Sequence, residues 1–260
     1  MVRSTLMVKV LILRTGGTNC DLETEWACKL AGAKPSRIHI SRITEGKVKL
    51  LDFDVLIIPG GFSYGDDLGA GKVLANELIL KAKDEITLFR EKKRPIIGIC
   101  NGFQVLVKAG LLPFKDQYVA SLVWNDSGRF EDRWVYLRVE QSISPFFKNL
   151  PEIIRFPVAH AEGKFVVKND RVLKKIENNS QIVLRYVNAA GEIADYPYNP
   201  NGSIAGIAGI CDEKGLIVGM MPHPERALLK IHEPDWHRNE TDDVFSFGYQ
   251  FFKNVIEYCS

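Results

Sequence analysis

The stretch "RPIIGICNGFQVLVKAGLLP", residues 94–113, passes from an apolar strand into a helical pattern through one sharp turn. Cys100 stands at that turn, with Gly98 and Gly102 two residues away on either side. A glycine–x–nucleophile–x–glycine pattern between a strand and a helix is typical of a nucleophile elbow, which holds the reactive side chain in a strained conformation. The glycines are needed because the strand and the helix approach too closely for larger side chains. We therefore predict that Cys100 is a nucleophile, in preference to a packed core cysteine.

Apolar runs of strand length alternate with helical patterns through the first half of the chain. Strands are predicted at residues 6–14, 37–42, 54–61 and 94–100, and helices at 21–32, 71–92 and 101–110. Nearly continuous apolar strands between helices indicate a mostly parallel central sheet flanked by helices. In open sheets of this kind, functional sites lie at the carboxyl ends of the strands, which is where Cys100 falls.

The second half of the chain has a different pattern. Strands are predicted at residues 134–140, 153–160, 163–167, 181–187 and 216–225, and a closing amphipathic helix at 245–259. Because few helical patterns separate these strands, part of this later region is expected to be antiparallel. No repeat, linker or low-complexity segment divides the chain, which predicts a single α/β domain over residues 1–260.

Composition argues against several classes of protein. The chain has 260 residues, 46% hydrophobic and 25% charged, with a formal net charge of +2. These values are ordinary for a globular domain and predict neither nucleic acid nor a membrane as a partner. The five cysteines are scattered and form no CxxC pair, so neither a disulfide framework nor a zinc site is predicted. The first apolar run is too short to cross a bilayer, and a cytoplasmic location is expected.

A thiolate nucleophile needs a base and a group that orients the base. His223 is the best candidate, because it follows a predicted strand and precedes Pro224 and Glu225. A residue before proline is held extended, and residues i and i+2 of an extended chain point the same way. Glu225 can therefore bind one ring nitrogen of His223 and leave the other for Cys100. The alternative is a surface loop that carries both side chains.

The backbone near Cys100 also predicts an oxyanion hole. An elbow offers the N–H of the next residue, here Asn101, at a helix N-terminus that also stabilises a thiolate. The second donor is expected from Gly61 or Gly60, because "PGGF" (59–62) follows another strand and glycine backbone can approach a ligand closely.

The segment "GDDLGAGKV" (65–73) has some likeness to a phosphate-binding loop. Asp66 stands in place of the first glycine of that motif, and Val73 in place of the hydroxyl residue that binds magnesium. No ATP site is therefore predicted here, and any ATP-driven chemistry belongs to a partner.

The segments "GICNGFQ" and "MMPHPER" together resemble class I glutamine amidotransferases of the Cys-His-Glu type. Longer segments are similar to the glutaminase components of phosphoribosylformylglycinamidine synthase, an enzyme of purine biosynthesis. These segments are "PGGFSYGDDLGAG", "CNGFQVLVKAGLLP", "PVAHAEGKF" and "NGSIAGIAGICDEKG". The similarity extends from about Val10 to Ala227 and so covers nearly the whole chain.

The resemblance implies a glutaminase in which Cys100 attacks the side-chain amide of glutamine, assisted by His223 and Glu225. Ammonia would pass to a synthetase subunit, in a complex that also holds a small accessory subunit. That partner would use ATP and magnesium to make formylglycinamidine ribonucleotide, and no cofactor or metal is expected in this chain. The resemblance also implies residues at or beside the glutamine pocket: Gly60, Phe62, Gln104, Asn125, Gly128 and Phe130.

Several other residues keep two interpretations. His160 could touch the partner or gate the site, or it could be a structural histidine. Arg226 could fix Glu225 or meet the partner. Asp66 and Asp67 could face the partner, although a solvated loop is favoured for both. Cys20 is expected to be a filler, because no histidine stands near it in the sequence in an activating pattern.

Three other functions stay open. The chain could be a class I amidotransferase that serves another acceptor, and the triad alone does not separate this from the leading hypothesis. It could be a stand-alone cysteine hydrolase with the same elbow. It could also be a non-catalytic regulatory subunit, although an intact cysteine, histidine and glutamate argue against that.

Overall fold

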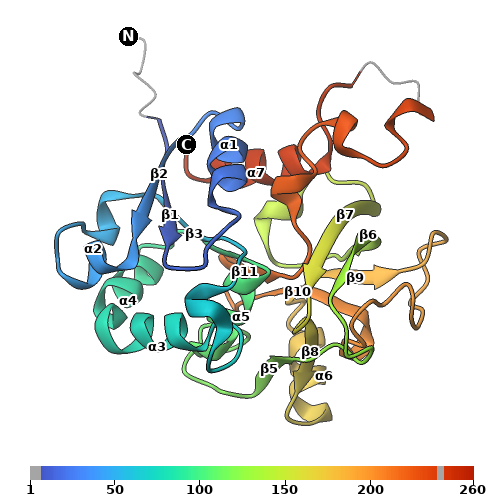
Figure 1. Cartoon of the computed structure of the whole chain (residues 1–260), viewed down its shortest axis with the longest axis horizontal. Coiled ribbons are helices and arrows are strands. Elements are labelled where there is room, and N and C mark those ends of the chain that lie inside the picture. The colour runs from blue at the N-terminus through green and yellow to red at the C-terminus, as the bar shows by residue number, and fades with distance from the viewer. Residues whose placement is uncertain (1–6, 239–242) are drawn as a thin grey trace.

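The computed structural model describes residues 7–238 and 243–260, so the first residue of the strand predicted at 6–14 lies outside the described residues. Within them, nine strands form one sheet in the order β2-β1-β3-β4-β11-β10-β9-β6-β7 (Figure 1). Five neighbours pair in parallel: β2 (Lys34–His39), β1 (Lys9–Arg14), β3 (Val55–Ile58), β4 (Ile96–Ile99) and β11 (Ile217–Met220). The rest pair antiparallel: β10 (Ile207–Cys211), β9 (Ile182–Val187), β6 (Glu131–Val139) and β7 (Ile153–His160). The predicted α/β fold, with a parallel centre and an antiparallel later region, is confirmed.

Most helices lie beside the parallel half of this sheet in Figure 1, and a small second ladder joins β5 (Ala120–Val123) to β8 (Lys164–Val167). The helices are α1 (Asp21–Leu30), α2 (Ile40–Thr44), α3 (Lys72–Lys81), α4 (Lys83–Glu91), α5 (Asn101–Lys108), α6 (Asp170–Asn178) and α7 (Phe247–Tyr258). In Figure 1, β1 and β3 lie to the left of the antiparallel strands β6, β7 and β9. Among the described residues, no helix has both the length and the apolar character that a membrane span needs.

The strand order places the candidate site at a switch point of the sheet. The connection from β1 to β2 runs one way along the sheet, and that from β3 to β4 runs the other way. Because such crossovers are right-handed, α1 and the pair α3–α4 cover opposite faces, and the boundary between β1 and β3 is the switch point of the sheet. The loops after these strands meet there through a bridge between Thr18 and Gly61, and Cys20 N donates to Gly60 O at 3.2 Å.

Continuous apolar runs became fully buried strands, as the sequence predicts. Every residue of β3 and β4 is buried, which explains why neither strand shows alternation. In contrast, β7 alternates between buried and half-buried residues, and His160 is the last of its buried positions. His160 therefore lies on the same buried face of β7 as Phe156 and Val158.

Several predicted boundaries are wrong. The strand expected at 37–42 ends at His39, because the His39 side chain accepts a hydrogen bond from Ser41 N at 3.2 Å and caps α2. The helix expected at 71–92 is divided at Ala82, whose φ of −127° and ψ of 15° leave helical geometry. The sequence patterns also missed β5, β10 and α6, and the strand expected at 216–225 ends at Met220.

Helix α7 docks close to the segment that carries His223 and Glu225. Its N-terminal Gly248 lies so near the turn Pro224–Arg226 that a Cβ on it would sit 2.1 Å from Pro224 O. The helix also packs against α1 and buries Phe251 completely. Helix α7 thus packs against the turn that carries Glu225 and supports that part of the candidate site.

Candidate active site

Cys100 occupies a strained turn between β4 and α5. Its φ of 50° and ψ of −104° lie in a region that non-glycine residues seldom adopt, and it is the N-cap of α5. The flanking glycines have no spare room: a Cβ on Gly98 would lie 2.6 Å from Gly102 C, and one on Gly102 would lie 1.9 Å from Ile58 O. The local geometry is therefore that of a nucleophile elbow.

His223 and Glu225 form a buried pair at the end of β11. His223 Nδ1 lies 2.6 Å from Glu225 Oε1, and both residues are only 1% exposed. Burial alone would lower the pKa of His223, but the Glu225 carboxylate and the Cys100 sulfur raise that pKa well above its ordinary value. Within the described residues, His223 Nε2 has no hydrogen-bond partner. Glu225 thus holds one ring nitrogen and leaves the other available for the chemistry of Cys100.

A cavity of about 290 Å³ opens onto Cys100. Its lining residues are Gly61, Phe62, Gly65, Asp66, Ala70, Cys100, Gln104, Trp124, Ala159, His160, Ala161 and Glu162. Among them are Gly61, Phe62, Cys100 and Gln104, which the sequence or the resemblance assigns to the active site. These come from the carboxyl ends of β3 and β4 and from the first turn of α5.

Gly60 lies next to the triad and does not line the cavity. A Cβ at this position would lie 2.8 Å from His223 Cε1 and 3.0 Å from Cys20 Sγ. Only glycine fits there without displacing the imidazole. Gly60 therefore makes room for the base, whereas the resemblance implies that it binds substrate.

The other predicted pocket residues lie further out. The Asn125 side chain is buried and donates to His160 O at 2.8 Å, while its oxygen accepts from Gly163 N at 2.9 Å. Phe130 packs on Phe62 with ring centroids 6.4 Å apart. Neither residue, nor Gly128, is among those that line the cavity.

Asn101 has separate uses for its backbone and its side chain. As the first residue of α5, it has no acceptor within the helix for its N–H, which suits an oxyanion donor. Its side chain accepts from Ser63 N at 3.2 Å and donates to Gln104 Oε1 at 2.9 Å. The side chain therefore ties the loop after β3 to the helix that begins at the nucleophile.

His160 is a neutral, buried part of the cavity wall. Its Nδ1 lies 3.1 Å from Asn125 Oδ1, and its Nε2 lies 3.5 Å from Asn201 Nδ2. Burial, and then the nearby His223, lower the pKa of His160 to about 3. With only 3% of its surface exposed, the side chain has no surface to offer a partner in this conformation.

The fold brings a histidine to Cys20, which the sequence predicts to be a filler. Cys20 Sγ lies 4.0 Å from His223 Nδ1, across 203 positions of sequence. Arg226 Nη2 donates to the same sulfur at 3.1 Å, and Arg226 Nε lies 3.9 Å from Glu23 Oε1. No local pattern in the sequence could have signalled this contact.

Cys20, His223 and Glu225 also place three potential metal ligands within 4.8 Å of one another. The His223 nitrogen and the Glu225 oxygen are already bonded to each other at 2.6 Å, closer than two ligands of one zinc ion would lie. The Arg226 guanidinium beside the sulfur further opposes a cation. The arrangement fits an acid–base site better than a metal centre.

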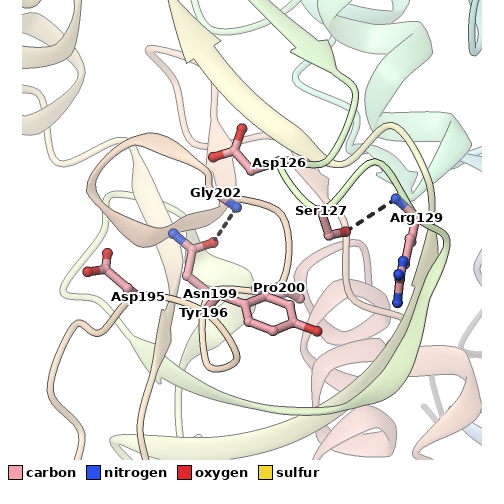
Figure 2. A pocket seen from close by; sticks show the side chains of 8 residues that line it. All are labelled: Asp126, Ser127, Arg129, Asp195, Tyr196, Asn199, Pro200 and Gly202. Carbon is pink, nitrogen blue, oxygen red and sulfur yellow. Dashed lines mark hydrogen bonds between the residues drawn. The ribbon is translucent and has the colours of Figure 1, made fainter.

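A larger hollow of about 560 Å³ lies between the loop after β5 and the loop before β10 (Figure 2). It is lined by Asp126, Ser127, Arg129, Asp195, Tyr196, Asn199, Pro200 and Gly202. Its lining includes neither a thiol nor an imidazole, and hydrogen bonds such as Gly202 N to Asn199 Oδ1 (3.2 Å) shape its loops. The chemistry therefore belongs to the smaller cavity at Cys100.

Comparison with known proteins agrees with this geometry. Residues 7–259 match the family model described as a CobB/CobQ-like glutamine amidotransferase domain. The fold and the match together define the class of protein, a glutamine amidotransferase.

Individual relatives identify a family within the glutamine amidotransferases. The chain is 43% identical over 255 residues to the PurQ subunit of phosphoribosylformylglycinamidine synthase from Dehalococcoides mccartyi, covering 97% of this chain and 98% of the relative. It is 39% identical over 265 residues to the PurQ subunit from Methanococcus maripaludis, covering 96% and 97%. The structure of PurLQS from Thermotoga maritima contains a chain that superposes with a TM-score of 0.76 at 33% identity, covering 98% of this chain and all of that one. This chain belongs to the PurQ family of glutamine amidotransferase subunits.

Proposed function

We propose that this chain hydrolyses L-glutamine through a Cys100 thioester and delivers the ammonia to a synthetase subunit of phosphoribosylformylglycinamidine synthase. The observation that carries the mechanism is the buried His223–Glu225 pair next to a strained cysteine that opens onto a cavity. A thiol, a base and an oriented carboxylate are the parts that acyl transfer needs. Membership of the PurQ family supports the purine-biosynthetic role.

The first half-reaction forms the thioester. The Cys100 thiolate attacks the amide carbon of glutamine, and the amide oxygen becomes an oxyanion. The N–H groups of Gly61 and Asn101 would stabilise that oxyanion. His223 then gives its proton to the amide nitrogen, the carbon–nitrogen bond breaks, and ammonia leaves.

The second half-reaction restores the enzyme. Water loses a proton to His223 and attacks the thioester carbon, and glutamate leaves as the bond to Cys100 breaks. Glu225 keeps the imidazole in one tautomer and stabilises its protonated form in both halves. The net reaction consumes one glutamine and one water and yields glutamate and ammonia.

The receiving chemistry lies in the partner. We propose that ATP and magnesium bind to the synthetase subunit, where ammonia converts formylglycinamide ribonucleotide to its amidine, with a small accessory subunit in the complex. We further propose that residues 1–260 act as one class I domain and that the complex works in the cytoplasm.

The test is a comparison of two nitrogen sources in the reconstituted complex. We expect glutamine to support amidine synthesis only when this chain is present, and ammonium chloride to support it without this chain. We also expect the synthetase to raise glutamate release by the isolated chain. Glutamate release at full rate without any partner would favour a stand-alone hydrolase, and synthesis of another product would favour another acceptor.

A further inference from the structure

Only one oxygen of the buried Glu225 carboxylate has a hydrogen-bond partner. Oε1 lies 2.6 Å from His223 Nδ1, whereas Oε2 has none among the residues that the structure describes, and Glu225 is 1% exposed. A carboxylate removed from water needs hydrogen bonds or a nearby positive charge to stay ionised. We propose that Arg226 is a positioning residue for the reaction, because its permanent charge keeps Glu225 ionised whenever His223 has lost its proton. This inference rests on the function proposed above.

The Arg226 guanidinium lies close behind the pair. Its Nη2 donates to Cys20 Sγ at 3.1 Å, and this sulfur lies within 4.8 Å of both a His223 nitrogen and a Glu225 oxygen. The two distances together place the guanidinium no more than about 8 Å from the carboxylate. At this separation the two charges still interact, because buried charges are screened much less than exposed ones.

Specific contacts hold the arginine in this position. The Cys20 thiol donates to Asn19 Oδ1 at 3.1 Å, so its sulfur is free to accept from Arg226. The backbone N–H of Arg226 donates to His223 O at 3.2 Å, and its Nε lies 3.9 Å from Glu23 Oε1. The Glu23 side chain is 40% exposed, so water weakens this ion pair. The arginine therefore bridges the N-terminus of α1 and the turn after β11.

The other titratable groups described beside the pair carry no lasting positive charge. Cys20 lies at the start of α1, Cys100 lies at the start of α5, and His160 ends β7. The two thiols can only be neutral or negative. Burial, and then His223, lower the pKa of His160 to about 3, so this imidazole is neutral near neutral pH. His223 itself is charged during only part of the reaction.

Helix α7, which packs against the same turn, adds no net charge. Its charged side chains are Lys253 and Glu257, which pair with each other at 3.7 Å. Burial alone would lower the pKa of Arg226, but the Cys20 sulfur and then the Glu225 carboxylate raise that pKa above its ordinary value. Arg226 is therefore the lasting positive charge beside the described pair.

This charge matters because the charge of the imidazole changes in each half-reaction. When His223 gives its proton to the departing ammonia, Glu225 loses its charged neighbour and binds a proton more readily. A protonated Glu225 could not stabilise the imidazolium that must form again in the second half-reaction. The Arg226 guanidinium is charged throughout and opposes this protonation in both halves.

The experiment measures kcat for glutamate release from about pH 5 to about pH 9, with the chain in complex with its synthetase. The variants are Arg226→Gln, which removes the charge, and Arg226→Lys, which keeps it; the control is Arg171→Gln, at an exposed arginine of α6. Ammonium-driven synthesis by the same preparation gives the pH dependence of the synthetase itself.

Loss of a positive charge makes either member of the pair easier to protonate, so the acidic limb of the profile should move to higher pH. We expect Arg226→Gln to move this limb up by at least about 0.5 pH unit. Arg226→Lys and Arg171→Gln should leave it within about 0.2 pH unit of wild type.

A lower kcat with an unmoved acidic limb would assign Arg226 a structural role and overturn the proposal, as would a shift of equal size in Arg226→Lys. Arg226→Met keeps the apolar stem of the side chain and repeats the test if Arg226→Gln does not fold. In these outcomes the wild-type complex still releases glutamate, and the proposed function stands. A wild-type complex that hydrolyses no glutamine overturns both.

Discussion

Cys20 and Cys100 are both buried, both cap the N-terminus of a helix, and both lie beside His223. Their backbones differ: Cys100 has φ 50° and ψ −104°, whereas Cys20 has an ordinary φ of −96° and ψ of 15°. Cys100 lines the cavity, and Cys20 does not. A neighbouring histidine is therefore not enough to define a nucleophile; the strained turn that exposes the sulfur to the cavity decides between the two.

The surroundings of Cys20 also differ from those of Cys100. Burial raises the pKa of the Cys20 thiol, although His223 and Arg226 oppose this rise. Its sulfur accepts from Arg226 Nη2 and donates to Asn19 Oδ1, each at 3.1 Å. Cys20 thus packs behind the His223–Glu225 pair, on the side of the imidazole that faces Glu225.

The largest expected effect comes from Cys100→Ala. Loss of the nucleophile should lower glutamate release by at least about 10⁴-fold, because no covalent intermediate can form. Ammonium-driven synthesis by the complex should be unchanged, and both rates are measurable on one preparation. Glutaminase activity above about 1% of wild type would point to a second nucleophile, with Cys20 the first to suspect.

Glu225→Gln should have the next largest effect, because it keeps the shape of the side chain and removes its charge. We expect a loss of up to about 10⁴-fold in glutamate release, as for a serine-protease triad with a neutralised orienting residue. A loss smaller than about threefold would show that the imidazole needs no carboxylate.

The same variant tests the electrostatics through stability. The folded-state pKa of His223 is raised, so its contribution to the free energy of unfolding is full below about pH 6.5 and is lost as the pH rises through the folded-state pKa. Glu225→Gln should remove most of this contribution. Denaturant titrations of both proteins should therefore differ more near pH 6.5 than at higher pH, and a constant difference would contradict the assignment.

Gly60→Ala tests whether the absence of a side chain at residue 60 is needed to position His223 between Cys20 and Cys100. The added Cβ would lie 2.8 Å from His223 Cε1, so the imidazole must move. We expect a loss of about 10²-fold in kcat, the size of effect that a misplaced catalytic group produces. Gly16→Ala is the matched control, since a Cβ there meets nothing within 4 Å. Equal kcat values for the two variants would show that the position of His223 does not depend on a glycine at residue 60.

The smallest effect is expected for Cys20→Ala. Glutamate release should stay within about threefold of wild type, because the triad is intact. The free energy of unfolding should fall by about 1 kcal/mol through the lost packing of one buried atom. A loss of activity comparable to that of Cys100→Ala would show that catalysis needs Cys20 as much as Cys100.

Much of this site is readable in the sequence because its signals are local. Gly98, Cys100 and Gly102 fall within five residues, so the steric argument suffices for the elbow. The extended-chain argument pairs His223 with Glu225, and the pair is present, but the premise is wrong, because Pro224–Arg226 form a 3₁₀ turn. Local signals also suffice for β3 and β4, whose continuous apolar runs predict burial on both faces.

What the sequence could not predict depends on distant loops. The contact of Cys20 with His223 and the placement of Glu162 beside Asp66 require the order of the strands, which no local pattern contains. The helical pattern continues through Ala82, where the backbone leaves helical geometry. The strand pattern continues past His39, where the side chain caps α2 and ends β2. Asp66 looked like a loop residue because its neighbours are polar; the turn after β3 directs it into the cavity.

The most direct test of the central claim is to label the complex with a glutamine analogue that carries a diazoketone in place of the amide, and then to map the modified cysteine by peptide mass. We expect a single adduct, on Cys100, whose formation is prevented by L-glutamine. An adduct on Cys20, or labelling that glutamine does not prevent, would contradict it.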